Sequence, residues 1–352
     1  MGVNQLTTPS VENGHVLRRV CIVGGAGFIG SHFVERLLGD PLIEAVKVYD
    51  NFTSGRRWHL LPFERDARFQ VIEGDVENLG ELTGAVAGFD TVIHLASNPD
   101  IARAATEPAV DFDQGTLLTH HVVEAVRLTG GARILYASGS GVYGDVGDLE
   151  AFEDYGPLVP ISTYGASKLA GEALIASYAF MFGLTGCAFR FGNVVGPHQT
   201  HGVGFDFTRR LIADPTRLRI LGDGQQSKSY VHVNDVIDAV LLAATQAPLP
   251  FAVYNVATGD YPTVREIAEL AGEVLGIEPG TTKLEFTGGD RGWKGDIPVV
   301  RLDSRRIRAL GWRNRRTSVE ALRASLESLV ADARSGHFDE QMIPESTLEP
   351  LE

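Results

Sequence analysis

Cysteine is scarce in this sequence, and the two that occur, Cys21 and Cys187, lie in apolar segments typical of strands. We interpret them as buried thiols in a reducing compartment, in preference to a disulfide or a metal-binding pair. Apolar runs are also short, since none reaches the ~18 residues that a membrane-spanning helix needs. Residues 1–14 are polar and contain no apolar signal core. We therefore predict a cytoplasmic location and no membrane partner.

Positive charge is in deficit as well. The 352 residues contain 31 lysines and arginines against 45 aspartates and glutamates, which gives a formal net charge of −14. This balance argues against nucleic acid or an anionic membrane as the main partner. An anionic small molecule would therefore need a local group of N–H donors and basic side chains. The length and composition are those of a soluble globular protein with one large domain or two moderate ones.

Glycine, by contrast, is regularly spaced near the N-terminus. Gly24, Gly27 and Gly30 follow the apolar run 20–23 and precede the helix-like segment 31–38. A strand, a glycine turn and a helix start in this order allow a tight turn and a close approach to a pyrophosphate. The free N–H groups and the dipole of the helix would then favour the phosphates. The G-x-x-G-x-x-G spacing is one residue wider than the commoner dinucleotide pattern.

Asp50 supports a dinucleotide site. It ends the strand-like segment 45–50 and lies 20 positions beyond Gly30, near the offset expected for a carboxylate that binds a ribose. Its charge would accept hydrogen bonds from a 2′-hydroxyl and repel a 2′-phosphate, which favours NAD over NADP. Arg56 and Arg57 follow soon after and weaken that preference. Taken alone, Asp50 would be a turn residue at a strand end, but with the glycine turn the cofactor interpretation is better.

Strand-like and helix-like segments then alternate along the chain. This alternation predicts an α/β fold with a doubly wound parallel sheet of the Rossmann type and helices on both faces. The strand-like segments are 20–23, 45–50, 69–76, 91–97, 132–138 and 186–191, and the main helical ones are 31–38, 115–128 and 163–182.

The pattern changes beyond residue 196 to loops, short helices and few strands. We expect residues 1–195 to form the NAD-binding Rossmann domain, with 1–17 disordered. Residues 196–335 would form a smaller α/β substrate-binding domain with helices near 264–275 and 318–333. Segments near 230–256 would return to the Rossmann body, and 336–352 would form an acidic tail.

Tyr164 and Lys168 give the strongest chemical signal. Four residues apart on the helix 163–182, they would share one face. An ammonium beside a phenol stabilises the phenolate and lowers a pKa that starts near ~10 toward the range of a general base. A tyrosine and a lysine at this spacing are commonly a surface pair. Downstream of an NAD-type turn, however, we predict that Tyr164 and Lys168 are catalytic.

The whole set of motifs resembles the extended short-chain dehydrogenase/reductase family, and in particular its NAD-dependent nucleotide-sugar epimerases and dehydratases. The resemblance covers nearly the full chain and implies an NAD retained through turnover and a nucleoside-diphosphate sugar as substrate. The motifs that carry it are 24–30, 50–55, 74–76, 94–97, 115–116, 138–144, Tyr164 with Lys168, 191–197 and 221–226.

The resemblance also assigns roles. Asp50 would hold the adenine ribose, Lys168 would bind the nicotinamide ribose, and Tyr164 would be the base at the sugar 4-hydroxyl. Lys228 and Arg291 would lie near the diphosphate. The full predicted set of cofactor-binding residues is Gly24, Gly27, Phe28, Ile29, Gly30, Asp50, Asn51, Asp75, Val76, Leu95, Ala96, Ser97 and Lys168. The predicted substrate-binding residues are Arg103, Ser138, Tyr164, Asn193, Val203, Gly204, Phe205, Lys228 and Arg291.

One departure from the family pattern lies before the Val142-Tyr143-Gly144 motif. The family's catalytic serine or threonine usually precedes that tyrosine by four residues, and Gly139 occupies this position. We expect the hydroxyl of Ser138 or Ser140 to replace it at the sugar 4-oxygen, with Ser138 preferred.

The same segment bears on the reaction. Sugar 4,6-dehydratases that resemble this chain carry an Asp-Glu pair directly after the catalytic hydroxyl, whereas Ser140 and Gly141 stand here. The prediction is therefore an NAD-dependent UDP-sugar 4-epimerase, which oxidises C4 to a 4-keto intermediate and reduces it again from either face.

Several alternatives stay open. The nucleotide could be TDP, and Arg103 could pair with a C6 carboxylate, so the substrate is UDP-glucose/UDP-galactose or UDP-glucuronate/UDP-galacturonate. A 4,6-dehydratase or a UDP-glucuronate decarboxylase would share the 4-keto intermediate. In another class, the chain could be a catalytically silent NAD-binding regulator.

Two further expectations concern metals and partners. His198 and His201 lie in a loop without a matching cluster of carboxylates or cysteines, so we predict no metal and regard them as candidates for substrate contact. The helices 115–128 and 163–182 resemble those through which relatives form a four-helix bundle, which implies a homodimer.

Overall fold

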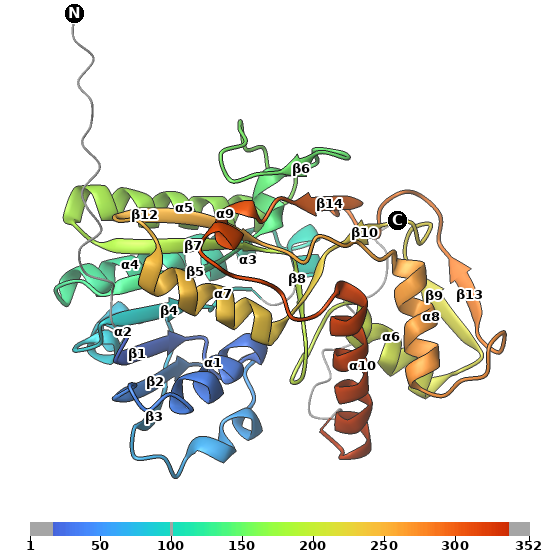
Figure 1. Ribbon diagram of the computed structural model, residues 1–352, viewed down its shortest axis with the longest axis horizontal. Coiled ribbons are helices and arrows are strands. Elements are labelled where there is room, and N and C mark those ends of the chain that lie inside the picture. Colours follow the sequence, from blue (N-terminus) through green and yellow to red (C-terminus); the bar gives the residue numbers. More distant parts are fainter. Residues whose placement is uncertain (1–16, 99–100, 338–352) are drawn as a thin grey trace, which may run out of the picture.

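A seven-stranded parallel sheet forms the larger of two lobes in the computed structural model, which describes residues 17–98 and 101–337 (Figure 1). Its order confirms the predicted doubly wound Rossmann-type fold, because strand order reverses between β1 and β4. From one edge to the other the strands are β12 (Phe251–Val256), β7 (Thr185–Phe191), β5 (Arg133–Gly139), β4 (Thr91–His94), β1 (Arg19–Val23), β2 (Ala45–Asp50) and β3 (Phe69–Glu73).

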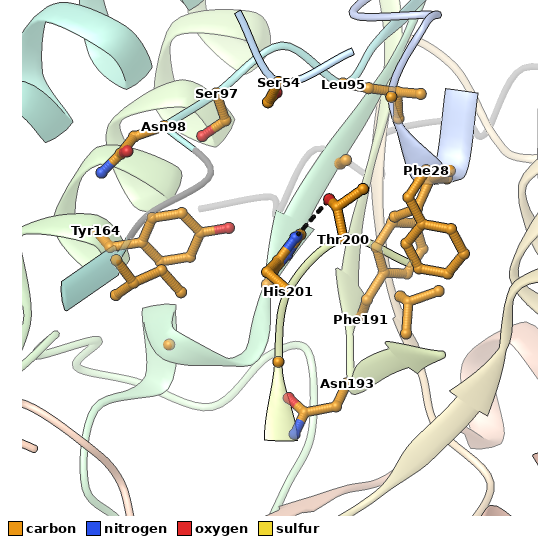
Figure 2. A pocket seen from close by; sticks show the side chains of 18 of the residues that line it. Phe28, Ser54, Leu95, Ser97, Asn98, Tyr164, Phe191, Asn193, Thr200 and His201 are labelled. Carbon is orange, nitrogen blue, oxygen red and sulfur yellow. Dashed lines mark hydrogen bonds between the residues drawn. The ribbon is translucent and has the colours of Figure 1, made fainter. Parts of the chain in front are cut away.

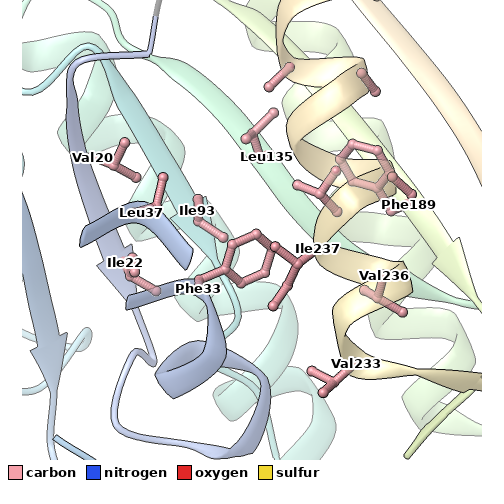
Figure 3. Packing of buried hydrophobic residues seen from close by; sticks show 14 of the residues in the cluster. Val20, Ile22, Phe33, Leu37, Ile93, Leu135, Phe189, Val233, Val236 and Ile237 are labelled. Atoms are coloured by element: carbon pink, nitrogen blue, oxygen red, sulfur yellow. The ribbon is translucent and has the colours of Figure 1, made fainter. Parts of the chain in front are cut away.

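Helices cover both faces of this sheet. One face is covered by α1 (Phe28–Leu38) and α7 (Val233–Gln246). Figure 3 shows Phe33 of α1 beside Ile237 of α7 over the sheet residue Ile93. The other face is covered by α2 (Leu79–Val86), α4 (Leu118–Leu128) and α5 (Thr163–Phe182). The short α3 (Ala109–Asp111) and a π-helical turn (Phe112–Leu117) lead into α4.

The packing of β1 explains why residues 20–23 are apolar at every position instead of alternating between apolar and polar. Val20 and Ile22 pack into the cluster under α1 and α7, whereas Cys21 and Val23 pack into the cluster on the opposite face. A parallel strand covered on both faces buries every side chain. Cys21 and Cys187 are both free and buried, as predicted, and burial raises the pKa of their thiols to about 12 and about 11.

The second lobe lies beside the carboxyl ends of the sheet strands (Figure 1). Its core is formed by α6 (Val203–Ala213), α8 (Val264–Val274) and α10 (Ser318–Arg334), with the parallel strands β9 (Arg217–Ile220) and β13 (Lys283–Phe286). The helices α8 and α10 each begin at a capping box, Thr263 with Glu266 and Thr317 with Glu320. The sequence predicted both helices, near 264–275 and 318–333.

Small sheets connect the two lobes. One contains β10 (Ser227–Lys228), β14 (Val299–Leu302) and β6 (Glu150–Ala151), and another pairs β11 (Tyr230–His232) with β8 (Asn193–Val195). The remaining elements are the helix α9 (Arg305–Ala309) and the 3-10 turns η1 (Arg57–His59), η2 (Leu61–Phe63), η3 (Ile101–Ala105) and η5 (Ser140–Tyr143).

The region near 230–256 divides between these parts. Segment 251–256 joins the main sheet as β12 and α7 packs on that sheet, whereas 230–232 pairs with β8 outside it. The expected disorder of 1–17 and the expected tail 336–352 lie outside the described residues, except at Leu17, Gly336 and His337. Within the described ranges, no helix has the length and apolar character required to cross a bilayer.

Candidate active site

A cleft runs along the carboxyl ends of β1, β2, β4, β5 and β7, where the second lobe meets them. This is the edge at which an open parallel sheet binds its ligands. The predicted site residues that line the cleft are Gly24, Gly27, Phe28, Ile29, Gly30, Asp50, Asn51, Asp75, Val76, Leu95, Ala96, Ser97, Ser138, Ser140, Tyr164, Lys168, Asn193, Val203 and Lys228. Four predicted site residues are not among the described residues that line the cleft: Arg103, Gly204, Phe205 and Arg291.

The glycine turn between β1 and α1 has the geometry for a pyrophosphate. Gly24 has a φ of +83°, and a Cβ there would lie 2.6 Å from the backbone nitrogen of Ala96. A Cβ on Gly30 would lie 2.6 Å from Gly25 Cα, so only glycine lets the helix pack on the turn. Gly27 is the N-cap of α1 and gives no side-chain cap, which leaves the first helical N–H groups for an anion.

Asp50 lies at the end of β2 and anchors the glycine turn by a hydrogen bond. Its Oδ2 accepts a hydrogen bond from the Ala26 N–H at 2.9 Å, and its Oδ1 accepts one from the Phe52 N–H at 2.8 Å. Burial raises the pKa of Asp50, while these two hydrogen bonds lower it. Each carboxylate oxygen retains a lone pair, so Asp50 can still accept a ribose hydroxyl from the cleft. The turn and Asp50 therefore fit NAD.

Tyr164 and Lys168 lie one turn apart on α5, where the predicted helix bounds 163–182 are those observed. Lys168 is buried, and its Nζ donates a hydrogen bond to the Ala137 carbonyl at 2.9 Å. The same Nζ lies 5.4 Å from the ring centroid of Tyr164. The Ala137 carbonyl, near the end of β5, thus holds the Lys168 ammonium close to the Tyr164 ring.

The predicted pKa of the phenol needs a correction. Burial raises the pKa of Tyr164 to about 12, and the carboxylate of Asp111 adds to this shift. Burial also lowers the pKa of Lys168 to about 8, because a buried ammonium loses its hydration. In the protein alone, desolvation therefore outweighs the ammonium. Oxidised NAD, if held here by the glycine turn and Asp50, would supply a second positive charge and hydride-transfer chemistry.

The two serines beside Gly139 have different surroundings. Ser138 is buried, and its hydroxyl donates a hydrogen bond to Glu172 Oε1 at 2.6 Å. Arg190 pairs with the same carboxylate at 2.7 Å, and both charged side chains are almost fully buried. Ser140 lines the cleft and forms no side-chain hydrogen bond with another described residue. A Cβ on Gly139 would meet no atom within 4 Å, so this position leaves open space in the cleft.

The predicted diphosphate cations are paired with acids of the protein. Lys228 Nζ lies 2.6 Å from Asp296 Oδ1, and Arg291 Nη2 lies 2.5 Å from Asp145 Oδ2. Arg103 of η3, which does not line the cleft, forms an ion pair at 2.7 Å with Glu107, just beyond that turn. Of the three basic residues, the structure brings only Lys228 to the cleft surface.

The two loop histidines occupy different places. Figure 2 shows the Tyr164 hydroxyl directed into the cavity and the ring of His201 opposite it. The Nδ1 atom of His201 lies 3.3 Å from the Thr200 hydroxyl. His198 is outside the cleft lining, and its Nδ1 lies 3.0 Å from the Ser31 hydroxyl. Only His201 is therefore placed for substrate contact.

Several residues in or next to the site were not predicted from the sequence. Arg210 and Arg219 line the second-lobe side of the cleft, and no local motif marks them. Glu172 follows Lys168 by four residues on α5, so the helical period could have placed it on the same face. Asp111 ends the short α3, directly before the π-helical turn that leads into α4, so no regular helical period marks it. In the part of the chain that the structure describes, no three histidine, cysteine, aspartate or glutamate side chains form a group able to hold a metal ion.

Comparison with known proteins identifies the family. The profile of the "NAD dependent epimerase/dehydratase family" matches residues 20–257. The chain belongs to this family. It is 33% identical over 319 residues to the UDP-glucose 4-epimerase of Mycolicibacterium smegmatis, covering 88% of this chain and 97% of that protein. The family assignment confirms the predicted resemblance and the predicted cofactor, NAD.

Two crystal structures show the same likeness in three dimensions. A UDP-galactose 4-epimerase is 36% identical, with a TM-score of 0.78, and the match covers 89% of this chain and 99% of the other. A double mutant of DesIV, the dTDP-glucose 4,6-dehydratase of Streptomyces venezuelae with NAD bound, is 26% identical. Its TM-score is 0.83, and the match covers 92% of this chain and all of the other. This member of the NAD-dependent epimerase/dehydratase family thus resembles enzymes of two reactions.

Proposed function

We propose that the protein is an NAD-dependent UDP-sugar 4-epimerase. The observation that carries this proposal is the wall of the cleft beside Tyr164, where the end of β5 offers Ser138, Gly139, Ser140 and Gly141 and no carboxyl group. Elimination of water from a 4-keto sugar needs an acid and a base next to the reacting carbons. Oxidation and reduction at C4 alone need only the phenol and the cofactor. The likeness to a UDP-glucose 4-epimerase at 33% identity supports the same reaction.

The residues would divide the work in the following way. NAD, which the glycine turn and Asp50 would hold, would supply the hydride acceptor and donor for C4 of the sugar. Tyr164, acting as a phenolate on the cleft surface, takes the proton of the 4-hydroxyl and gives it back, while the Lys168 ammonium stabilises the phenolate charge. Ser140 donates a hydrogen bond to the 4-oxygen, because the Ser138 hydroxyl is already bonded to Glu172. Between the two hydride transfers the 4-keto sugar turns its other face to the cofactor.

The open cleft gives the keto sugar room for that rotation. Gly139 leaves space next to Ser140, and the His201 side of the cavity faces Tyr164 (Figure 2). We place NAD against the first lobe and the nucleotide sugar against the second, with Lys228 and Arg219 at the nucleotide end. Arg103, the predicted partner of a C6 carboxylate, is paired instead with Glu107. We therefore favour the neutral pair UDP-glucose and UDP-galactose over the uronic acids.

The decisive experiment is product analysis with the purified protein and its bound NAD. UDP-glucose, UDP-glucuronic acid and TDP-glucose are incubated separately, and the products are resolved by chromatography and NMR. A C4 epimer of one of them supports the proposal. A 4-keto-6-deoxy sugar or released carbon dioxide would establish a dehydratase or a decarboxylase instead. Retained NAD with no change in any sugar would establish a silent NAD-binding protein.

We also propose a homodimer formed through α4 and α5, which lie side by side on the sheet face opposite to α1 (Figure 1). The end of α5 exposes large apolar side chains, with Phe180 at 74% and Met181 at 72% exposure. Burial of such a surface in a second copy stabilises a dimer. Sedimentation at micromolar concentration checks this, and a monomer would contradict it. The two free buried cysteines suit a reducing compartment such as the cytoplasm.

A further inference from the structure

Asp111 is a buried carboxylate that joins the two segments on either side of the reacting phenol. It lies at the end of α3 and is 1% exposed. Its Oδ1 accepts a hydrogen bond from Asn98 Nδ2 at 2.9 Å, and its Oδ2 accepts one from the Thr163 hydroxyl at 2.7 Å. Asn98 belongs to the cleft-lining turn after β4, and Thr163 directly precedes Tyr164 at the start of α5. One side chain therefore fixes the cofactor side and the phenol side of the cleft to each other.

The surroundings of Asp111 include no paired cation. Among the described residues, no basic side chain forms an ion pair with it. A buried carboxylate held only by two neutral donors is costly unless a positive charge lies within electrostatic reach. The buried cation of this region is Lys168, and the negative charge of Asp111 raises its pKa against the effect of burial. The same charge raises the pKa of Tyr164.

We propose that Asp111 is a positioning residue for the Tyr164–Lys168 pair, one that anchors the start of α5 to the turn after β4 and keeps the Lys168 ammonium charged in its buried site. The anchor is the pair of hydrogen bonds to Asn98 and Thr163. The electrostatic part follows from a negative charge that acts on a desolvated ammonium within its electrostatic reach. Its role in turnover rests on the proposed function, but the effect on the two titrations does not.

Other titratable groups near the pair have separate partners. On β4, His94 is buried and neutral, since burial lowers its pKa to about 3. On β5, burial raises the pKa of Tyr136, which lies under the Lys168 ammonium at 5.2 Å. On α5 itself, Glu172 is paired with Arg190. Arg103 of η3 is paired with Glu107, and His201 lies across the cleft from Tyr164 (Figure 2).

The test compares two variants that separate charge from geometry. Asp111→Asn keeps the shape, and a threonine hydroxyl can donate or accept, so both hydrogen bonds can persist without the charge. Thr163→Val keeps the charge and removes one hydrogen bond. Both variants are studied with NAD bound and without substrate, by NMR of isotope-labelled tyrosine and lysine side chains. The chain has 9 tyrosines and five lysines, and Tyr164→Phe and Lys168→Met assign the two signals.

In Asp111→Asn, we expect the titrations of Tyr164 and Lys168 both to move to lower pH, by about one pH unit. In Thr163→Val, neither titration moves by that amount, whereas turnover of an active nucleotide sugar falls and Thr163→Ser restores it. Both limbs of the pH profile of kcat should move to lower pH together in Asp111→Asn, which a general structural disturbance would not cause.

Unchanged titrations in Asp111→Asn would overturn the inference, and so would opposite shifts of the two groups. If Asp111→Asn does not fold, Asp111→Ser provides the same measurement, because serine also lacks the charge and has a smaller side chain. The titrations need no substrate. A protein that shows the two shifts but converts no nucleotide sugar would therefore refute the proposed epimerase and leave this inference standing.

Discussion

The Lys228 ammonium lies 2.6 Å from the Asp296 carboxylate, although the two residues are 68 positions apart in the chain. Asp296 also accepts a hydrogen bond from the Gly292 N–H through its other oxygen, at 3.0 Å. The side chain of Asp296 is 7% exposed, whereas that of Lys228 is 25% exposed and lines the cleft. Asp296 thus holds Lys228 at the cleft surface, where the ammonium can also bind an anionic ligand.

Replacement of this lysine should weaken nucleotide binding and leave the cofactor in place. In Lys228→Met, the affinity for UDP is expected to fall about tenfold to a hundredfold, because a hydrogen bond from a charged donor is lost and Asp296 is left unpaired beside an anion. Titration calorimetry measures the affinity, and absorbance after denaturation measures the NAD content. Lys283→Met is the matched control, since Lys283 is exposed on β13. Equal UDP affinity in both variants would remove Lys228 from the binding site.

Loss of the Tyr164 hydroxyl should abolish chemistry without unfolding the helix. In Tyr164→Phe, kcat is expected to fall about a hundredfold to ten-thousandfold, the usual contribution of a positioned general base. NAD should remain bound, since Lys168 and the glycine turn are unchanged. Tyr178→Phe removes a hydroxyl from the same helix, where it donates to Glu124, and is expected to keep nearly full activity. A similar loss in both variants would point to damage of α5 rather than loss of the base.

The serines on either side of Gly139 should respond differently to alanine. Ser140→Ala is expected to lower kcat about tenfold through loss of one hydrogen bond to the sugar, with an unchanged melting temperature. Ser138→Ala removes a donor from the buried Glu172, so its free energy of unfolding should fall by about 1 kcal/mol. Calorimetry and steady-state kinetics on both variants separate the two effects. Full activity in Ser140→Ala would refute the proposed sugar contact.

Stability should decline in mild acid because of a buried histidine at the cofactor turn. The Nδ1 atom of His59 donates to the Ala26 carbonyl at 2.8 Å. Its Nε2 is buried and has no hydrogen-bond partner among the described residues, which suits a neutral ring. Burial lowers the pKa of His59 from 6.5 to about 4. Between these two pH values the unfolded chain binds more protons than the folded one. The free energy of unfolding therefore falls as the pH drops from about 6.5 to about 4.

The size of this effect is about 2–3 kcal/mol for His59 alone. Chemical denaturation at several pH values measures it. In His59→Gln, which retains a donor for Ala26, the decline should be shallower by that amount. His120→Gln changes a half-buried histidine of α4 and is the control. An equally steep decline in His59→Gln and in the original protein would show that other groups cause the acid sensitivity.

Much of the fold was predictable because its signals are local. The helix 163–182 begins where Ser162 caps it and ends at Gly183, whose φ of +73° places it in the left-handed region. The run 20–23 is apolar at every position because helices cover both faces of its strand. The glycine turn and Asp50 specify the cofactor edge in the same way. Such features depend on neighbours in the chain, so the sequence alone determined the Rossmann fold, the family and the cofactor.

The tertiary structure alone decided which side chains offer free polar groups to the cleft. The hydroxyl of Ser138 is not free to donate to a ligand in the cleft, because Glu172, 34 residues later, accepts its hydrogen bond. The pKa of Tyr164 rises because packing removes water from a phenol that the helical spacing only places near Lys168. Spacing in the sequence gives the backbone position of a group, but its partner and its hydration come from segments that meet only on folding.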